Sequence, residues 1–316
     1  MKTLLITRPL PEPVLSAARA SWDVTLRENT LPLDAAELRA ALRDFDAVLP
    51  TLGDRFRADV FADVPHPRAK ILANFGVGYN HIDVAAARAA GLVVTNTPGA
   101  VTDATADIAM LLMLATARRA GEGERTLRAG NWTGWHPTQF LGMHISGKRL
   151  GIIGMGRIGK AIARRAHLGF GMEVVFANRS AVADAGVPAT QVPMEQAMAA
   201  DIVVTAVPAT AETHHLINAA TLAHMRPHAI FVNIARGDVV DETALIAALQ
   251  TGRIAGAGLD VYEFEPQVPP ALMAMENVTL LPHLGTAALE VRVGMGMMAV
   301  ANLAAHAEGR DLPNPV

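Results

Sequence analysis

Leu150-Gly-Ile-Ile-Gly-Met-Gly-Arg-Ile-Gly159 is the stretch that decides the fold, because an apolar run leads directly into three glycines at GxGxxG spacing. In this motif the first glycine, Gly154, makes a tight turn, Gly156 lets backbone approach a pyrophosphate, and Gly159 lets a helix pack on a strand. The motif alone is weak evidence, but residues 149–153 read as a strand and residues 158–168 repeat apolar side chains at helical spacing. The stretch therefore predicts a dinucleotide site, with the phosphates at the helix N-terminus.

The composition is that of a globular protein. The chain has 316 residues, enough for two domains, and 51% of them are hydrophobic. No apolar run reaches the roughly 18 residues of a membrane helix, and residues 1–7 predict a first strand rather than a signal peptide. A net charge of −3 without a long basic run gives no sign of nucleic-acid binding. The absence of cysteine excludes thiolate catalysis and cysteine-ligated zinc, and it fits the reducing cytoplasm in which we expect the protein.

The strand pattern predicts two parallel α/β domains. In the first part of the chain, strands are expected at 3–7, 23–26, 47–49, 70–74 and 93–95, and helices at 13–20, 34–41 and 84–90, followed by a long helix at 103–119. From residue 149 onward, six strands are expected at 149–153, 173–177, 202–206, 230–234, 254–259 and 278–281. Six strands with intervening helices predict a doubly wound parallel sheet, the Rossmann fold of a cofactor domain.

The ends of the chain are expected to form one domain together. The residues after the sixth strand, helical over 287–308, are too few for a domain of their own and should return to the first one. We therefore predict a small flavodoxin-like substrate domain of residues 1–98 plus 286–316. The dinucleotide-binding domain, residues 99–285, is inserted into it, with crossings near Pro98 and Gly285.

A long connection, residues 121–147, carries Trp132, Trp135 and Phe140. Ordinary loops run about 4 to 6 residues, so this segment is expected to be functional or to form an interface. It could fold back on its own domain, or it could bury its aromatic side chains on a second subunit. We favour the second interpretation, a dimerisation arm, and expect a homodimer.

Polar residues that follow the strands are the candidates for chemistry, because ligands of an open parallel sheet bind outside the carboxyl ends of its strands. Arg236 follows the fourth strand, Glu265 follows the fifth and His283 follows the sixth. An arginine fork can hold a carboxylate, and a histidine can give a proton to a developing alkoxide near neutral pH. Each residue alone has an ordinary structural explanation, but the three together predict reduction of a 2-oxo acid by a nicotinamide cofactor.

Five segments together resemble the D-isomer-specific 2-hydroxyacid dehydrogenases, most closely their glyoxylate and hydroxypyruvate reductase branch. They are GVGYNHID at 76–83, GIIGMGRIG at 151–159, NIARGDVVDE at 233–242, GAGLDVYEFEP at 256–266 and PHLGTA at 282–287. The resemblance implies that Arg236 binds the substrate and that His283 and Glu265 form the acid–base pair.

The same resemblance implies further contacts with the substrate and the cofactor. Val77 and Gly78 would bind the substrate carboxylate through backbone N–H groups, and Trp135 would reach the active site of a second subunit. Thr105 and Asp260 would lie near the nicotinamide, with Pro208 and Thr213 along the ribose–phosphate path. The full set of expected cofactor contacts is Thr105, Gly154, Gly156, Arg157, Ile158, Gly159, Asn178, Arg179, Ser180, Val207, Pro208, Thr213, Ile234, Ala235, Asp260 and Gly285.

Residues Asn178-Arg179-Ser180 indicate which dinucleotide is bound. An NAD site expects an acid at the end of the second strand, roughly 20 residues past the glycines, to hold the ribose 2′-hydroxyl. That acid is missing here, and an arginine and a hydroxyl that could bind a 2′-phosphate stand in its place. The sequence therefore predicts NADPH in preference to NADH, although NADH is not excluded.

Three other interpretations compete with this one. A dehydrogenase for a bulkier 2-oxo acid would use the same catalytic residues. The sequence does not give the shape of the pocket that would distinguish the two substrate classes. A dinucleotide-sensing binding protein would be expected to carry an acid at the end of the second strand, against Asn178-Arg179. Neither His214–His215 nor the pair His224 and His228 has the i, i+4 helical spacing of a zinc site, so no metal is expected.

Overall fold

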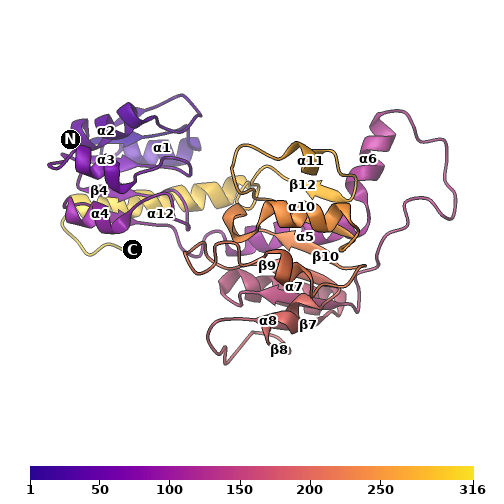
Figure 1. Ribbon diagram of the computed structural model, residues 1–316. Helices are drawn as coiled ribbons and strands as arrows, with labels where there is room; N and C mark the ends of the chain where they lie inside the picture. The colour runs from indigo at the N-terminus through magenta and orange to yellow at the C-terminus, as the bar shows by residue number, and fades with distance from the viewer. The chain divides into compact units, whose positions relative to one another are not determined.

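The computed structural model describes residues 1–316 and divides them into two compact units, each built on a parallel sheet (Figure 1). Unit 1 contains residues 1–101 and 287–316, and unit 2 contains residues 102–286. The divisions fall close to Pro98 and Gly285, where the sequence pattern breaks. None of the helices combines the length and the apolar character that crossing a lipid bilayer requires.

Unit 1 has a five-stranded sheet in the order β2-β1-β3-β4-β5, which is the flavodoxin-like order. Its strands are β1 (Thr3–Ile6), β2 (Asp23–Leu26), β3 (Ala47–Leu49), β4 (Ile71–Ala73) and β5 (Val93–Thr95). One core cluster joins the sheet to α1 (Glu12–Arg19) and α12 (Leu289–Ala307). A second joins it to α2 (Ala35–Asp44), α3 (Ala58–Asp63) and α4 (Val84–Ala89). Helix α3, which sequence reasoning missed, is only six residues long and too short to show a helical period.

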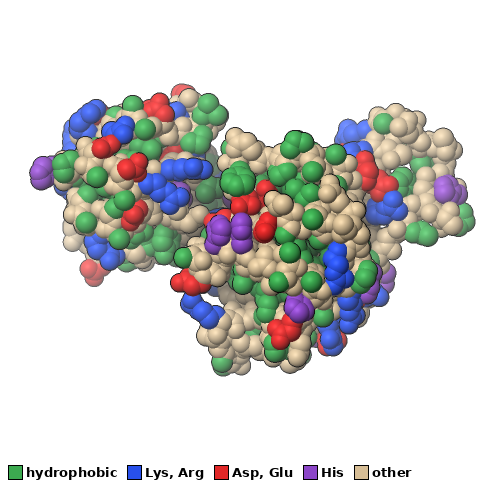
Figure 2. Space-filling model, viewed as in Figure 1, with side chains coloured by type: hydrophobic (Ala, Val, Ile, Leu, Met, Phe, Trp, Pro, Cys, Tyr) green, Lys and Arg blue, Asp and Glu red, His purple; other side chains and the backbone are tan.

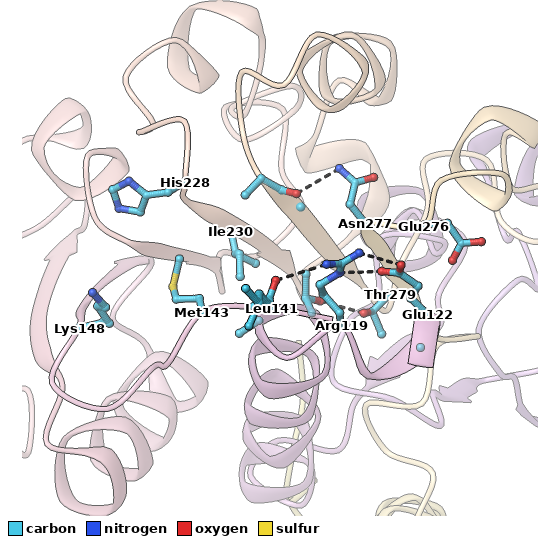
Figure 3. Close-up of a pocket in the computed structure, with 16 residues that line it drawn as sticks. Arg119, Glu122, Leu141, Met143, Lys148, His228, Ile230, Glu276, Asn277 and Thr279 are labelled. Carbon is cyan, nitrogen blue, oxygen red and sulfur yellow. Dashed lines mark hydrogen bonds and ion pairs between the residues drawn. The ribbon is translucent and has the colours of Figure 1, made fainter. Parts of the chain in front are cut away.

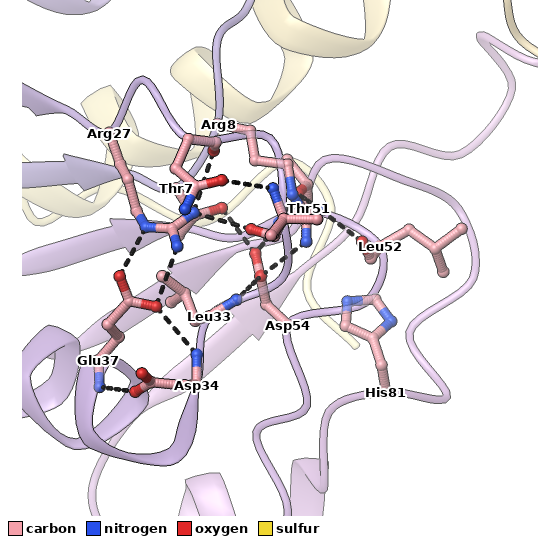
Figure 4. A network of polar contacts seen from close by, with 12 residues as sticks. Thr7, Arg8, Arg27, Leu33, Asp34, Glu37, Thr51, Leu52, Asp54 and His81 are labelled. Atoms are coloured by element: carbon pink, nitrogen blue, oxygen red, sulfur yellow. Dashed lines mark hydrogen bonds and ion pairs between the residues drawn. The ribbon is translucent and has the colours of Figure 1, made fainter. Parts of the chain in front are cut away.

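A buried ion pair fixes the loops at the carboxyl ends of β1 and β3 in unit 1 (Figure 4). Asp54 is 0% exposed and accepts hydrogen bonds from Thr7 Oγ1 at 2.6 Å and from the backbone N–H of Leu33 at 3.0 Å. Arg8 donates to Asp54 at 3.0 Å and also to Thr51 and the carbonyl oxygen of Leu52. The turn after β3 is thereby tied to the end of β1.

Unit 2 has a seven-stranded sheet in the order β12-β11-β10-β9-β6-β7-β8, and every pairing in it is parallel. The chain reverses its direction of winding between β6 and β9, which makes that junction the topological switch point. The strands are β6 (Arg149–Ile153), β7 (Glu173–Ala177), β8 (Ala189–Gln191), β9 (Ile202–Thr205), β10 (Ile230–Asn233), β11 (Gly256–Leu259) and β12 (Val278–Leu280).

All six predicted strands are present, and β8 is the one that sequence reasoning missed. This strand lies at the edge of the sheet and its three residues, Ala-Thr-Gln, are intermediate or exposed. It therefore lacks the apolar run by which the six others were recognised. The central strands are buried on both faces, as expected where helices cover both sides of a parallel sheet.

Helices cover both faces of the unit 2 sheet. One core cluster includes α5 (Thr102–Ala117) and α7 (Arg157–Phe170). The other includes α8 (Met194–Met198), α9 (Ala219–Leu222), α10 (Glu242–Gln250) and α11 (Pro270–Met273), with the 3₁₀ turn Gly237–Val239. The sheet is thus packed between two helical layers, and the loops after its strands start from buried strand ends.

The segment predicted to be a connection, residues 121–147, overlaps helix α6 (Ala120–Arg128), which projects from the body of unit 2 (Figure 1). This corrects the expectation of a loop throughout. Helix α6 buries none of its residues, and Leu127 is its only large apolar side chain, so the sequence offers no apolar stripe that would reveal it. The chain then runs through an irregular stretch in which Trp132 is 49% and Trp135 is 79% exposed.

Candidate active site

The glycine turn after β6 has the shape that a pyrophosphate requires. Gly154 has φ +100°, and a Cβ placed on it would lie 2.8 Å from the carbonyl oxygen of Ala206. A Cβ on Gly159 would lie 2.2 Å from the carbonyl oxygen of Gly154, so α7 packs directly against the turn. Gly156, the N-cap of α7, faces open space and offers no side-chain cap to the first turn. The free N–H groups of α7 are thus accessible to a phosphate.

Asn178 ties the loop after β7 to this glycine turn. Its side-chain oxygen accepts a hydrogen bond from the backbone N–H of Met155 at 3.1 Å, and its amide donates to the carbonyl oxygen of Ser180 at 2.9 Å. Gln191 at the end of β8 donates to the carbonyl oxygens of Asn178 and Ser180 at 3.2 and 3.1 Å. Strand β8, which sequence reasoning missed, therefore helps to shape the 178–180 loop that is proposed to contact the cofactor ribose.

Arg179 is exposed and makes no hydrogen bond or ion pair. A hydrogen bond from Thr210 and, more weakly, the charge of Arg179 hold the pKa of Glu212 below its ordinary value. Arg179 therefore lies close enough to the loop after β9 for its charge to be felt there. Its guanidinium is available to a ligand that binds between these loops.

The loop after β9 is folded by Thr213. The Thr213 hydroxyl donates to the carbonyl oxygen of Pro208 at 2.7 Å and accepts from the backbone N–H of Thr210 at 2.8 Å. Val207 lies against Gly154, because a Cβ on that glycine would come within 2.8 Å of its side chain. Val207 thus lies beside the glycine turn, and Pro208 and Thr213 belong to the same loop.

Arg236 occupies the turn after β10, and Asn233 shapes this turn. The Asn233 side chain accepts from the backbone N–H of Ala235 at 3.1 Å and donates to the carbonyl oxygen of Arg236 at 3.0 Å. Arg236 Nη1 donates to the carbonyl oxygen of Ala235 at 2.7 Å, whereas Arg236 Nε is buried and has no partner. Burial lowers the pKa of Arg236, and the charges of Glu265, Asp238 and Asp260 oppose that effect. A buried donor without an acceptor is costly, so a ligand that offers an acceptor to Arg236 Nε would be favoured here.

His283 and Glu265 form a hydrogen-bonded pair after β12 and β11. His283 Nδ1 lies 2.8 Å from Glu265 Oε2, and Glu265 Oε1 accepts from the backbone N–H of Tyr262 at 3.0 Å. Burial acts to raise the pKa of Glu265, but the hydrogen bond and charge of His283 outweigh it and hold that pKa below its ordinary value. Glu265 is therefore ionised and fixes the proton on Nδ1, which leaves Nε2 of His283 to exchange a proton with a ligand.

The backbone of His283 is left-handed, with φ +54°, an uncommon conformation for a residue other than glycine. Asp260 holds it there: the N–H of His283 donates to the Asp260 carbonyl oxygen at 2.9 Å, and the Asp260 carboxylate accepts from the N–H groups of Leu284 at 2.6 Å and Gly285 at 2.8 Å. Asp260 is 1% exposed, and burial raises its pKa. Thr105 Oγ1 also donates to the carbonyl oxygen of Gly285 at 3.2 Å. Both residues thus position the histidine loop.

Gly237 is a site residue that sequence reasoning missed. A Cβ placed on it would lie 1.8 Å from the carbonyl carbon of Tyr262, so the loop after β10 touches the backbone of the loop after β11. The Tyr262 hydroxyl donates to the carbonyl oxygen of Leu281 at 2.9 Å, which ties in the loop after β12 as well. The glycine directly after Arg236 was a visible signal, but its neighbour in space could not be known.

A cluster of two histidines and an acid also lies at this edge. His214, His215 and Glu263 place one possible ligand atom each within 4.8 Å of the others, and Figure 2 shows histidine side chains beside acidic ones on the surface of unit 2. Sequence spacing missed the cluster because Glu263 arrives from another loop. The two imidazole rings are stacked, with centroids 4.0 Å apart and an interplanar angle of 24°.

The remaining predicted substrate contacts lie elsewhere in the chain. Val77 and Gly78 belong to the loop after β4 in unit 1, where their carbonyl oxygens accept hydrogen bonds from the side chains of Asn96 at 2.9 Å and Asn74 at 3.1 Å. Their backbone N–H groups make no hydrogen bond within the unit. Trp135 lies in the exposed stretch after α6.

A Rossmann sheet with an open glycine cradle, a buried arginine donor and a histidine–glutamate pair defines a nicotinamide-dinucleotide-dependent oxidoreductase. Residues 110–285 match the family described as D-isomer specific 2-hydroxyacid dehydrogenase, NAD binding domain. The chain belongs to this family, within its glyoxylate and hydroxypyruvate reductase branch, and is an NAD(P)-dependent dehydrogenase.

Relatives extend the match over nearly the whole chain. The glyoxylate reductase of Thermococcus onnurineus is 43% identical over 99% of this chain and 95% of its own length. The glycerate dehydrogenase of Hyphomicrobium methylovorum is 38% identical over 94% of each chain. The crystal structure of the NADPH-dependent glyoxylate/hydroxypyruvate reductase of Sinorhizobium meliloti, in complex with NADP and malonate, has a TM-score of 0.88 and 37% identity, covering 100% of this chain and 96% of that one.

Proposed function

We propose that this protein uses NADPH to reduce small 2-oxo acids: glyoxylate to glycolate, which is achiral, and hydroxypyruvate to the D-isomer of glycerate. The observation that carries the proposal is the His283–Glu265 pair, 2.8 Å apart, at the same sheet edge as the unpartnered Nε of Arg236. A proton donor and a binding site for an anion are the two functions that the protein must add to a nicotinamide cofactor. The names of the Thermococcus and Sinorhizobium relatives support this substrate class.

The residues divide the work by their chemistry. A bound nicotinamide dinucleotide supplies the hydride. Arg236 holds the substrate through its free donors, which stabilise negative charge on the carboxylate or the keto oxygen. His283 gives its Nε2 proton to the developing alkoxide, while the Nδ1 proton stays on the hydrogen bond to Glu265. Glu265 remains ionised throughout and stabilises the imidazolium, as a lowered pKa requires.

The loop after β4 in unit 1 is the proposed contact for the substrate carboxylate. The backbone N–H groups of Val77 and Gly78 are without acceptors, and Asn74 and Asn96 hold the carbonyl oxygens of the same loop. Successive free N–H groups form a small anion-binding concavity. A bulkier 2-oxo acid would bind to the same groups, so the side chains around them determine which acid is preferred.

NADPH is the proposed cofactor because Arg179 and Ser180 are exposed at the end of β7, where an NAD site would carry an acid. Charge-assisted hydrogen bonds of the kind that Arg179 would make to a 2′-phosphate contribute roughly 1.5 to 3 kcal/mol each. The Sinorhizobium relative, described as NADPH-dependent, is consistent with this choice.

We further propose that the arm, residues 121–147, binds a second copy of the chain. Trp132, Trp135 and Leu141 are exposed in it, and large exposed apolar side chains gathered on one segment are typical of an interface. Trp135 would then lie at the active site of the second subunit. Equilibrium sedimentation tests the dimer directly, and a monomer at micromolar concentration would contradict it.

A panel of 2-oxo acids, assayed with NADPH and with NADH, tests the proposed function. We expect kcat/KM to be highest for glyoxylate and hydroxypyruvate with NADPH, and to fall for branched and aromatic acids. A higher kcat/KM for a bulky acid would make the alternative substrate class correct. Equal use of both dinucleotides would refute the cofactor assignment. No turnover of any acid would refute the proposed reduction of 2-oxo acids.

A further inference from the structure

His215 joins two loops that are far apart in the sequence. It lies in the loop after β9, and its Nε2 is 2.7 Å from Oε1 of Glu263 in the loop after β11. Its backbone is left-handed, with φ +49°. This conformation is held because the N–H of His215 donates to the carbonyl oxygen of Asp238 at 2.9 Å, and its own carbonyl oxygen accepts from the side chain of Asn218 at 3.0 Å. The imidazole is thus aimed at Glu263 by its own backbone.

Glu263 is also held from its other side by Glu242. The N–H of Glu263 donates to Glu242 Oε1 at 3.0 Å, and the N–H of Glu242 donates to Glu263 Oε2 at 3.4 Å. Glu242 is only 5% exposed, and burial raises its pKa. Both carboxylate oxygens of Glu263 are therefore engaged, one by His215 and one by Glu242, and residue 263 has little freedom to move.

The position of residue 263 matters because the catalytic glutamate is two residues further along. The N–H of Tyr262 donates to Glu265 Oε1 at 3.0 Å, and Glu265 Oε2 in turn lies 2.8 Å from His283. The backbone of Tyr262 also touches Gly237, the residue after Arg236. A shift of residues 262–263 would therefore move Glu265 relative to His283 and Arg236 together.

We infer that His215 is a positioning residue: through Glu263 it fixes the 260–265 loop and so sets the geometry of the Glu265–His283 pair. The inference rests on the proposed function and adds a residue that touches neither the substrate nor the reacting atoms. It also links the loop proposed to run beside the cofactor to the loop that holds Glu265. Misplacement of a catalytic group by about 1 Å can cost on the order of 10²-fold in rate.

A metal ion bound by His214, His215 and Glu263 is the competing interpretation. The rings of the two histidines are stacked at 4.0 Å, so their in-plane nitrogen lone pairs run side by side instead of converging on one point. Glu263 Oε1 already accepts the His215 hydrogen bond at 2.7 Å. The geometry therefore favours a direct hydrogen bond between His215 and Glu263.

The test compares His215→Leu with His215→Gln. Both variants carry the same backbone cost at residue 215, but only glutamine can donate a side-chain N–H to Glu263. We expect His215→Leu to lower kcat for the best 2-oxo acid of the panel on the order of 10-fold, and His215→Gln to restore most of it. The Kd for NADPH, measured by its fluorescence, should change less than about threefold, because Thr213 folds the cofactor loop independently of His215.

His228→Leu is the matched control. His228 Nε2 lies 2.8 Å from Asp201 Oδ1, a second histidine–carboxylate pair in the same unit, but it lies at the opposite edge of the sheet. This variant should leave kcat unchanged. Equal kcat loss in the three variants would make the effect one of general stability and overturn the inference, as would glutamine failing to rescue.

Two further measurements test whether His215 acts through Glu263 and whether the cluster binds a metal ion. If His215→Leu and Glu263→Ala act through one contact, the double variant should be no worse than the worse single variant. Full additivity would refute the contact. Melting curves with added ZnCl₂ address the ion: a Zn²⁺-dependent stabilisation of the unaltered protein that His215→Leu lacks would make the cluster a metal site. An inactive unaltered protein would instead contradict the proposed function itself.

Discussion

The amino and carboxyl edges of the unit 2 sheet differ in the features that could mark a functional site. The amino edge holds a cavity of about 680 Å³, lined by polar groups that include Arg119, Lys148 and His228 (Figure 3). These groups are largely satisfied: Arg119 pairs with Glu122 at 2.7 Å, and His228 pairs with Asp201 at 2.8 Å. At the carboxyl edge, Arg236 Nε is buried and unpaired, and His283 is held in a left-handed conformation.

The difference teaches that an unsatisfied buried donor marks this site better than cavity volume does. A left-handed backbone does not separate the two edges, because Arg119 at the amino-edge cavity has φ +52° and His283 has φ +54°. Folding tends to satisfy every buried donor, so a donor left over is expected where a ligand will supply the acceptor. Strain at His283 persists only because Asp260 and Glu265 hold the residue from two sides. The amino edge has a cavity, but Arg119 and His228, which line it, already have partners. We therefore expect substitutions there to affect stability and leave catalysis intact.

The largest expected contrast is between the two histidines. His283→Ala should lower kcat on the order of 10² to 10⁴-fold, because it removes the proposed proton donor. His228→Ala, at the amino edge, should change kcat less than twofold. Steady-state assays with glyoxylate and NADPH measure both. A retained rate in His283→Ala across the pH range would refute its role as the acid.

The second contrast concerns the cations. Arg179→Ala should raise the KM for NADPH roughly 10- to 100-fold and leave the KM for NADH nearly unchanged, because only NADPH carries the 2′-phosphate. Lys148→Ala, an exposed cation that lines the amino-edge cavity, should affect neither. Equal losses for NADPH and NADH in Arg179→Ala would show that the arginine does not read the phosphate.

The third contrast uses two glycines that both lack room for a side chain. A Cβ on Gly237 would lie 1.8 Å from the backbone of Tyr262, and a Cβ on Gly256 at the amino edge would lie 2.6 Å from the carbonyl oxygen of Asn277. Alanine at either position should lower the melting temperature, at a cost of about 1 to 3 kcal/mol.

Only Gly237→Ala should also lower kcat, by about 10-fold, because it separates the loop of Arg236 from the loop of Glu265. The rates are compared at a temperature at which circular dichroism shows both variants to be folded. An equal loss of kcat in Gly256→Ala would mean that the two edges are mechanically coupled and would break the contrast.

The sequence predicted the fold because most elements of this protein carry a local pattern of apolar residues or glycines that identifies them. The glycine motif and the buried strands of unit 2 carry their own signals, and six strands were placed correctly. Two of the features that were missed have no apolar period: β8 is polar and lies at an edge, and α6 buries no residue. Helix α3 does bury Val60 and Phe61, but its six residues are too few to show a period. Physical periodicity can predict an element only where the element buries a face.

For the site, the sequence predicted the main functional residues but not the residues that support them. Arg236, Glu265 and His283 could be proposed because the carboxyl ends of parallel strands meet at one edge, and the structure brings Glu265 and His283 within 2.8 Å. Their supports could not be found that way. Gly237 depends on contact with Tyr262, and Glu263 meets His215 only in three dimensions. Such contacts leave no trace in spacing.

The smallest predicted effects are on stability, and here the two edges should behave alike. Burial acts to raise the pKa values of Glu265 and Asp201, but their histidine partners help to hold both below their ordinary values of 4.5 and 3.8. A carboxylate with a lowered folded-state pKa stabilises the fold above its unfolded-state pKa, and this contribution is lost as pH falls through the folded-state pKa.

Glu265→Gln and Asp201→Asn should therefore each destabilise the protein by about 1 kcal/mol at pH 7, and each should lose less further stability than the unaltered protein below about pH 4. Urea unfolding at pH 7 and pH 3.5 measures this. Catalysis separates the two, because only Glu265 contacts His283: Glu265→Gln should lower kcat, and Asp201→Asn should not. If both variants kept full activity, the glutamate would be a stabilising partner of His283 alone, and the asymmetry between the two edges would rest on Arg236 and His283.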